Sequence, residues 1–324
     1  MSSRRSVVSS TKIWMVSVAL LSSHTLLALL LWNVLGMTYL EEVRIRARGP
    51  LPADHPAVLS LVKNTFLNPP SVLPYNLSTD PIYTKAKNLG TWNFIYENIA
   101  KVFQGQRGGF FVEAGALDGE RGSNTLWLEQ ELGWTGLLVE PNPLSYQKLL
   151  SKQRKAWISN TCLSPEPFPL ESVLVSYSRR DMGQLRALEN AITYIGSSHL
   201  LGATLESHAF DYVFKESDKS YFSTQCFPLE SYLLALNVST IDFLSLDIQG
   251  VEKRILQNVP WNTLNIRVLV VEIVNPQVYV EQFENFMKSN GYRLMVSGDI
   301  DYIFIKEGDP SLTVPGSLRN ASKI

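Results

Sequence analysis

The sequence predicts an α/β domain built on a mostly parallel sheet. Three short apolar runs each end in an acidic residue, and they lie at residues 110–119, 136–140 and 241–247. This pattern is typical of buried parallel strands. Both faces of such a strand are covered, so polar side chains occur only where the strand ends and its loop begins. Glu140 follows Gly115 by 25 residues, close to the step of about 20 residues that brings a carboxylate to a ribose hydroxyl. The three runs therefore predict a sheet shaped to hold a nucleoside.

The elements of this sheet follow from apolar periodicity and from helix and turn signals. Apolar residues three and four positions apart predict an amphipathic helix over 88–103. Ser123 or Asn124 can cap the next helix, Gly133 can end it, and Pro143 suits the first turn of another. Strands are expected at 110–112, 137–139, 156–162, 172–176, 241–246, 267–273, 292–297 and 301–305. Helices are expected at 88–103, 123–132, 143–152, 229–236, 251–257 and 278–289.

The order of these elements predicts the architecture. Strand and helix alternate until a final hairpin turns through Gly298 and Asp299, which predicts a mostly parallel sheet with one antiparallel edge strand. The polar residues 178–220 are expected to be an insertion over the mouth of the site, with His199 and His208 exposed rather than catalytic. This arrangement suits the Rossmann-like fold of S-adenosylmethionine-dependent methyltransferases.

Length, composition and charge allow one sizeable domain with an appendage. The chain has 324 residues, of which 45% are apolar and 18% charged, enough for a large core. Its net charge of −1 gives no overall field that attracts nucleic acid, so no nucleic-acid partner is expected.

An apolar segment lies near the N-terminus. Residues 13–40 contain no Lys, Arg, Asp or Glu. About 20 apolar residues cross a bilayer, whereas the apolar region of a cleaved signal peptide is only about 7–15 residues long. The segment therefore predicts a single transmembrane signal anchor. Basic residues balance on its two sides, so the positive-inside rule gives no orientation; the short tail 1–12 and the large domain that follows favour a cytosolic N-terminus.

The rest of the chain divides into a stem, a domain and a tail. Six prolines in residues 41–80 predict an extended stem. The domain is expected at 81–306 and a disordered tail at 307–324.

Sequons and cysteines bear on the compartment. Asn76, Asn237 and Asn320 begin N-x-S sequons, which agree with a lumenal domain, although two or three are expected by chance. Cys162 and Cys226 could form a disulfide in the lumen, and they would be two buried thiols in the cytosol. The sequence does not give their separation.

The first two acidic runs supply candidate cofactor residues. Gly115 and Gly119 permit a tight turn and close ligand approach, and Glu113 can accept hydrogen bonds from an ammonium group; the alternative is a turn that only packs on the sheet. Glu140 could accept both ribose hydroxyls, with Asn142 beside it. The alternative for Glu140 is an ordinary acidic residue favoured by the dipole at a helix start.

Asp247 and Glu272 are the candidate catalytic residues. Each follows a predicted strand, so both are expected at the rim where the reactive methyl would lie. Carboxylates at this rim could bind a metal, orient an acceptor hydroxyl or act as a base. The alternative is helix-start electrostatics, and we assign no metal site.

These motifs resemble a known group. Residues 110–119, 136–143, 226–236 and 241–252 resemble the FkbM-type methyltransferase domain, and more closely the arthropod Star-like proteins, which carry this domain behind one membrane anchor. The resemblance covers about residues 85–306. It implies S-adenosylmethionine as the cofactor, with Glu113, Gly115, Glu140 and Asp247 at the matching positions.

The same resemblance implies a role. Star acts in moving a membrane-bound EGF-receptor ligand from endoplasmic reticulum to Golgi. A Star-like protein would act in trafficking of membrane-bound cargo through endoplasmic reticulum, Golgi and endosomes, with the plasma membrane as a further location. The FkbM pattern usually has an acidic residue where this chain has Gln249, which cannot act as a base. Trafficking is therefore the first hypothesis and an active O-methyltransferase the second; no oligomeric state follows.

Overall fold

The structure, a computed structural model, describes residues 15, 18, 21–32, 50–79, 90–177, 198–203, 215–273 and 276–312. The chain divides into two compact units, Met1–Leu51 and Pro52–Ile324. The first unit contains a helix over residues 21–32, and most of the remaining predicted anchor lies outside the described residues. Within the described part of the chain, no helix combines the length and apolar character needed to cross a membrane.

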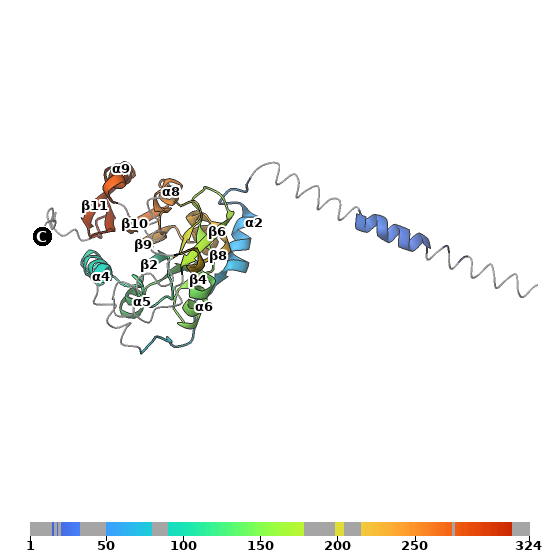
Figure 1. The fold of residues 1–324 in the computed structure, drawn as a ribbon, viewed down its shortest axis with the longest axis horizontal. Helices are drawn as coiled ribbons and strands as arrows, with labels where there is room; N and C mark the ends of the chain where they lie inside the picture. The colour runs from blue at the N-terminus through green and yellow to red at the C-terminus, as the bar shows by residue number, and fades with distance from the viewer. Residues whose placement is uncertain are drawn as a thin grey trace, which may run out of the picture. The chain divides into compact units, whose positions relative to one another are not determined.

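The second unit is built on an eight-stranded sheet (Figure 1). Its strands are β1 (Leu67–Asn68), β2 (Phe110–Ala114), β3 (Thr135–Val139), β4 (Trp157–Ser159), β9 (Thr240–Leu246), β10 (Asn265–Glu272), β11 (Tyr292–Ser297) and β12 (Asp301–Lys306). They lie in the order β1-β4-β3-β2-β9-β10-β12-β11. The five strands from β4 to β10 are parallel, while β1, β12 and β11 pair antiparallel with their neighbours. The predicted final hairpin is confirmed, and its second strand inserts between β10 and β11.

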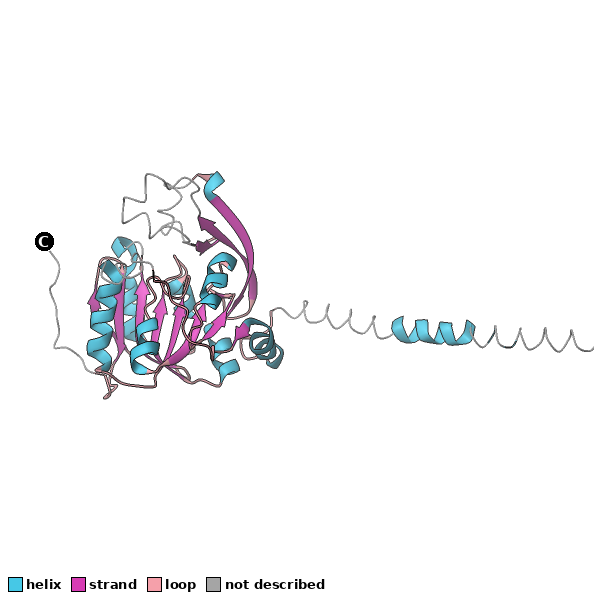
Figure 2. Cartoon of the chain, turned by 90° about the horizontal axis from the view of Figure 1, so that it is seen from below, coloured by secondary structure: helices cyan, strands magenta, loops and turns pink. Residues whose placement is uncertain are grey.

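Helices cover both faces of this sheet (Figure 2). They are α4 (Gly90–Phe103), α5 (Leu126–Leu132), α6 (Pro143–Ser151), α7 (Leu229–Leu236), α8 (Glu252–Gln257) and α9 (Pro276–Ser289). Six consecutive residues of β10 are buried, as expected of a parallel strand covered on both faces. The predicted ends at Gly133 and Pro143 are confirmed, because Gly133 adopts a left-handed conformation after α5 and Pro143 is the first residue of α6. The predicted start of α5 is wrong, because the helix begins at Leu126 with Thr125, and not Ser123 or Asn124, at its N-cap.

A second sheet of four strands lies beside the first. Its strands are β5 (Cys162–Leu163), β6 (Leu170–Tyr177), β7 (Ser198–Leu200) and β8 (Lys219–Phe227), in the order β5-β8-β6-β7. Figure 2 shows its long strands curving up past the main sheet. The strand predicted over 156–162 is in fact two strands, β4 and β5, which belong to different sheets. Of the predicted insertion 178–220, residues 178–197 and 204–214 lie outside the described residues.

A disulfide joins Cys162 and Cys226, whose Cα atoms are 4.3 Å apart. The two residues are register partners in neighbouring strands β5 and β8. Replacing both by serine is expected to lower the free energy of unfolding by about 2–4 kcal/mol, because the bond restricts a long loop in the unfolded chain. Urea denaturation measures the loss. A reductant should destabilise the wild type by a similar amount and leave the double variant unchanged; equal sensitivity of both proteins would contradict the assignment.

Much of the predicted stem is part of the domain. Helix α2 (Pro56–Leu61) and the π-helical turn Val62–Phe66 bury Val58 and Val62, and β1 pairs with β4. Periodicity missed this segment because the helix is short and its last turn is π-helical. The structure thus differs from a free spacer over residues 52–79.

Residues 307–312 also differ from the predicted disordered tail, because Arg267 forms an ion pair with Asp309 (2.7 Å) and Leu312 is buried. Among the sequons, Asn76 and Asn237 are exposed, and Asn320 lies outside the described residues. Glycosylation at these positions stays a prediction.

Candidate functional site

The site lies where the carboxyl ends of β2, β3 and β9 meet. Strand β2 has β3 on one side and β9 on the other, so the chain changes direction across the sheet at this point, where open α/β sheets bind their ligands. The amide of Gly115 donates to Val139 O (3.0 Å), and the amide of Asp247 donates to Ala114 O (3.1 Å). The three predicted acidic runs therefore come together as expected.

Glu113 organises the loop between β2 and α5. Its Oε1 accepts from the amide of Asn124 (2.8 Å), and its Oε2 accepts from the hydroxyls of Ser123 (2.9 Å) and Thr125 (2.5 Å). Burial raises the pKa of Glu113, and Arg154 opposes that shift. These internal contacts use three of the about four acceptor positions of Glu113, so little capacity is left for the predicted contact with a ligand's ammonium group.

Arg154 completes this buried network, and the sequence analysis missed it. The guanidinium is fully buried. Its Nε donates to Glu129 Oε1 (2.9 Å), its Nη2 donates to the Thr125 hydroxyl (3.0 Å), and its Nη1 donates to Gly119 O. Arg154 follows α6 in a stretch without any motif, so only its contacts reveal that it fixes the loop.

The two loop glycines serve close packing. Both have left-handed backbones, with φ of 85° at Gly115 and 74° at Gly119. A Cβ atom at Gly115 would lie 1.9 Å from Asp247 O, and one at Gly119 would lie 2.2 Å from Leu149 Cδ1. Gly115 therefore allows the loops after β2 and β9 to touch at the site.

Glu140 lies at the carboxyl end of β3 and is almost fully buried. Its Oε2 accepts from the amide of Leu117 (2.7 Å) and its Oε1 from the amide of Asn142 (2.8 Å). Burial raises its pKa to about 8, and the nearby carboxylates of Asp247 and Asp118 add to that shift. The carboxylate is held in place at the point where sequence reasoning put a ribose ligand.

Asn142 has a structural role in addition to its place beside Glu140. Its Oδ1 caps α6 by accepting from the amides of Leu144 (2.9 Å) and Ser145 (3.3 Å). Its Nδ2 donates to the hydroxyls of Ser176 (2.8 Å) and Ser198 (3.1 Å). The side chain thus joins the second sheet to the rim of the site, and these contacts occupy the groups that it would offer a cofactor.

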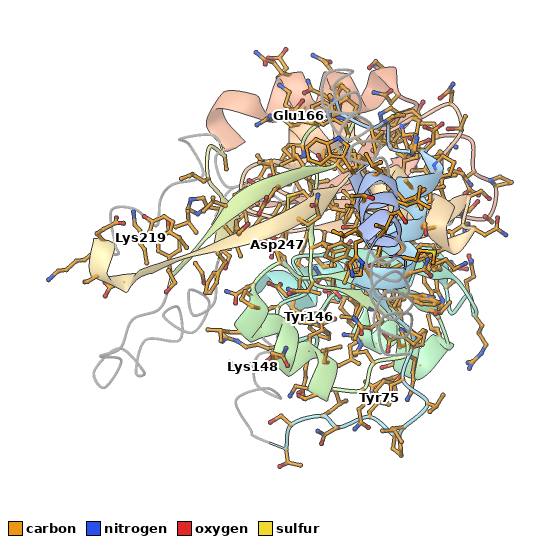
Figure 3. The ribbon with its side chains drawn as sticks, turned by 90° about the vertical axis from the view of Figure 1, so that its right-hand side faces the viewer. Tyr75, Tyr146, Lys148, Glu166, Lys219 and Asp247 are labelled. Carbon is orange, nitrogen blue, oxygen red and sulfur yellow. A yellow bond between two sulfur atoms is a disulfide. The ribbon has the colours of Figure 1, made fainter. Side chains whose placement is uncertain are left out.

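The two candidate catalytic residues meet through Gln249. Its Nε2 donates to Asp247 Oδ1 (2.8 Å) and to Glu272 Oε2 (2.7 Å). Asp247 is exposed, and Figure 3 labels it near the middle of the domain. Burial, followed by the charge of Asp247, raises the pKa of Glu272 well above its usual value. A neutral amide therefore links two carboxylates, one exposed and one inclined to hold a proton.

Two further expectations concern metals and histidines. Across the described ranges, no group of three or more His, Cys, Asp or Glu side chains is arranged to hold a metal ion. His199 is buried rather than exposed as predicted, and its ring lies beside that of Tyr177. His208 lies outside the described residues.

Raising the pH from 5 to 9 is expected to lower the free energy of unfolding. Burial raises the pKa of Glu140 to about 8 and the pKa values of Glu252 and Asp301 to about 7, whereas such groups titrate near about 4 when unfolded. The folded state therefore binds more protons between these values, and its stability falls as the pH rises through the folded-state pKa. Urea denaturation across this range should show the fall, and Glu140→Gln should flatten it. A stability that rises from pH 5 to 8 would contradict the prediction.

Solved structures and one family model resemble this chain. No curated protein matches the sequence. Methyltransferase FkbM from Methylobacillus flagellatus KT has a similar solved structure, with 10% identity and a TM-score of 0.37, and the match covers 69% of this chain and 58% of that one. The N-terminal domain of human METTL16, solved in complex with SAH, is 12% identical with a TM-score of 0.27, covering 76% and 78% of the two chains.

Human methyltransferase 10 domain containing protein is also similar, at 10% identity and a TM-score of 0.29, over 77% of this chain and 93% of that one. TM-scores this low support no conclusion about this chain. The sequence match is more informative: residues 113–294, more than half of the 324, match the family model for the methyltransferase FkbM domain. The α/β fold with its mostly parallel mixed sheet is methyltransferase-like, and the chain belongs to the FkbM methyltransferase domain family.

Proposed function

We propose that this domain binds S-adenosylmethionine at the carboxyl ends of β2, β3 and β9 and transfers its methyl group to an acceptor. The observation that carries the proposal is Glu140, a buried carboxylate held by two backbone amides beside the glycine loop. Family membership supports the same reading.

The residues present fit the cofactor. The described contacts use one hydrogen bond on each oxygen of Glu140. In the ionised form, which a pKa of about 8 makes dominant only in more alkaline solution, the carboxylate offers about four acceptor positions. Two positions are left to accept the ribose hydroxyls. Gly115 keeps the backbone of the neighbouring loop bare where a side chain would collide with Asp247 O, so the two loops can close around a ligand.

The chemistry then depends on the residues of the rim. When bound, S-adenosylmethionine supplies an electrophilic methyl group, which bonds to an acceptor lone pair as its carbon–sulfur bond breaks. Asp247 is the exposed carboxylate of the rim, and it accepts the proton that an acceptor hydroxyl loses. Burial, followed by the charge of Asp247, raises the pKa of Glu272, which favours a carboxyl group that orients the acceptor by donating a hydrogen bond. Positioning supplies most of the rate enhancement in this scheme.

Calorimetry of the full chain with S-adenosylmethionine tests the proposal. Micromolar binding is expected in the wild type, with a loss of tenfold or more in Glu140→Gln, because the neutral amide accepts on one atom only. Glu171→Gln, an exposed change on β6, is the matched control and should bind like the wild type. Absence of binding at millimolar cofactor would sink the proposal.

A second candidate function is trafficking of membrane cargo through the surface of the domain, without methyl transfer, as the resemblance to Star-like proteins implies. Gln249 favours it, because its amide bridges Asp247 and Glu272 where the family usually has an acidic residue. Transfer from methyl-labelled cofactor in a cell extract separates the candidates. Label on an acceptor in the wild type supports the enzyme; label only after Gln249→Glu supports trafficking.

The proposed location is the lumenal side of endoplasmic reticulum, Golgi and endosome membranes. The disulfide supports an oxidising compartment, and the apolar segment 13–40 supports a single anchor. Glycosidase treatment of the expressed protein should change its mobility, and an N-terminal tag should stay inaccessible from outside intact cells. An accessible tag together with unchanged mobility would show that the orientation is opposite to the proposed one.

A further inference from the structure

We propose that the carboxyl ends of β9 and β10, together with the amino end of the antiparallel strand β12, form a subsite for a primary ammonium group of the methyl acceptor. This inference rests on the proposed function, because it places the acceptor beside the cofactor. The subsite consists of Asp247, Gln249, Glu272 and Asp301, which we call the acidic rim.

Strand register places these groups side by side. Leu246 pairs with Val271 across β9 and β10, so Asp247 and Glu272, the next residues, lie next to each other. Glu272 pairs in turn with Asp301 across β10 and β12. Directly opposite residues of antiparallel strands have Cβ atoms about 4.5–5.5 Å apart. Three carboxylates thus follow one another along the same edge of the sheet.

The acidic rim has unfilled buried acceptors. Asp301 is 6% exposed, and its Oδ2 has no hydrogen-bond partner. Gln249 Oε1 is also buried without a partner. The amide is oriented with its nitrogen toward the carboxyl groups of Asp247 and Glu272. Buried acceptors without a donor are costly, so an external donor would satisfy these two atoms, one in β12 and one in the loop after β9.

A primary ammonium group satisfies this set. It carries three donors and no acceptor, and its charge offsets that of the rim. Among the ion pairs of the described residues, none places a Lys or Arg on Asp247, Glu272 or Asp301. A metal is the poorer candidate, since the described side chains form no cluster suited to one.

The ammonium group serves for recognition and is not the methylated atom. A protonated amine has no lone pair, so it cannot attack a methyl group, and the acidic rim favours the protonated form. The methylated atom must be another nucleophile of the same acceptor. The substrate class is therefore a molecule that carries both a hydroxyl or similar nucleophile and a primary amine.

Protonation supports the same reading. Burial, followed by the charge of Asp247, raises the pKa of Asp301 to about 7, and Asp299 adds to that shift. Burial in the same surroundings raises the pKa of Glu252 to about 7 and also raises the pKa of Glu272. A bound cation stabilises the ionised carboxylates, so it should release protons on binding and bind more tightly at pH 8 than at pH 6.

Ligand-observed saturation-transfer NMR on the full chain provides the test. The probe is ethanolamine, and the matched neutral molecule is ethylene glycol. S-adenosylhomocysteine is present in excess, so that the cofactor's own ammonium position is filled. Ethanolamine should give a signal with millimolar affinity that strengthens from pH 6 to 8, and ethylene glycol should give none.

Variants connect the signal to the acidic rim. Asp301→Asn and Glu272→Gln should each weaken ethanolamine binding at least fivefold, whereas Glu307→Gln, an exposed carboxylate just after β12, should not. Thermal unfolding shows whether Asp301→Asn and Glu272→Gln are folded. If one of them is not, the binding measured with the other tests the subsite. Equal signals from both probes, insensitivity to both rim variants, or displacement by Mg²⁺ at constant ionic strength would overturn the subsite.

The outcomes also separate the subsite from the proposed function. If S-adenosylhomocysteine binds and ethanolamine does not, the subsite fails while the cofactor site stands. If ethanolamine binds through Asp301 and S-adenosylhomocysteine does not, the cation site stands while the proposed methyl transfer fails.

Discussion

Replacing Arg154 by methionine is expected to lower the free energy of unfolding by about 3–5 kcal/mol. The guanidinium and its partner Glu129 are both fully buried. Methionine fills part of the space but leaves the buried Glu129 without its counter-charge, although the amide of Lys155 and the Tyr75 hydroxyl still donate to it. It also removes the donors to Thr125 Oγ1 and Gly119 O. Urea denaturation measures the loss, and it should come with weaker cofactor binding, because the glycine loop loses its support.

Two matched variants sharpen this prediction. Arg154→Met with Glu129→Leu removes both buried charges and should recover much of the lost stability, since a well-packed apolar pair often replaces a buried ion pair at little cost. Arg254→Met breaks the exposed ion pair with Glu166 and should cost less than about 1 kcal/mol. Equal losses for Arg154→Met and Arg254→Met would show that the buried network does not stabilise the loop.

The main sheet could be predicted because each of its central strands is recognisable from its own residues. Strands β2, β3, β9 and β10 are mostly apolar, and an acidic residue or a glycine ends each strand or follows it directly. A run of this kind needs no knowledge of its neighbours. The segment 52–79 was missed for the opposite reason. Its backbone is satisfied by distant groups, such as the Arg154 carbonyl that accepts from the amide of Ser71 (3.0 Å).

The same distinction between local signals and distant contacts applies to the site. Glu140 and Asp247 were predicted because each one ends a strand. The network around Glu113 could not be predicted, because its partners lie in the turn before α5 and only the folded chain brings Arg154, from the turn after α6, to the Ser123 hydroxyl. Gln249 was visible as a departure from a pattern, but sequence alone could not show that its amide bridges two carboxylates.

Replacing Gly115 by alanine is expected to destabilise the domain by about 2–5 kcal/mol and to abolish cofactor binding. Two costs combine. The left-handed backbone costs an L-residue about 1–2 kcal/mol, and overpacking adds typically about 1–3 kcal/mol. The added Cβ would lie 1.9 Å from Asp247 O, a backbone atom. Because a backbone carbonyl cannot rotate away as a side chain can, the loops after β2 and β9 must separate.

Gly122 supplies the control for this prediction. It lies in the same loop region with a φ of 67°, but no atom lies within 4 Å of its added Cβ. Gly122→Ala therefore incurs the backbone cost alone, about 1–2 kcal/mol, and should leave cofactor binding intact. Urea denaturation and calorimetry on the two variants separate conformational strain from collision. If both variants lose stability equally and both still bind S-adenosylmethionine, the contact between the two loops is not what shapes the site.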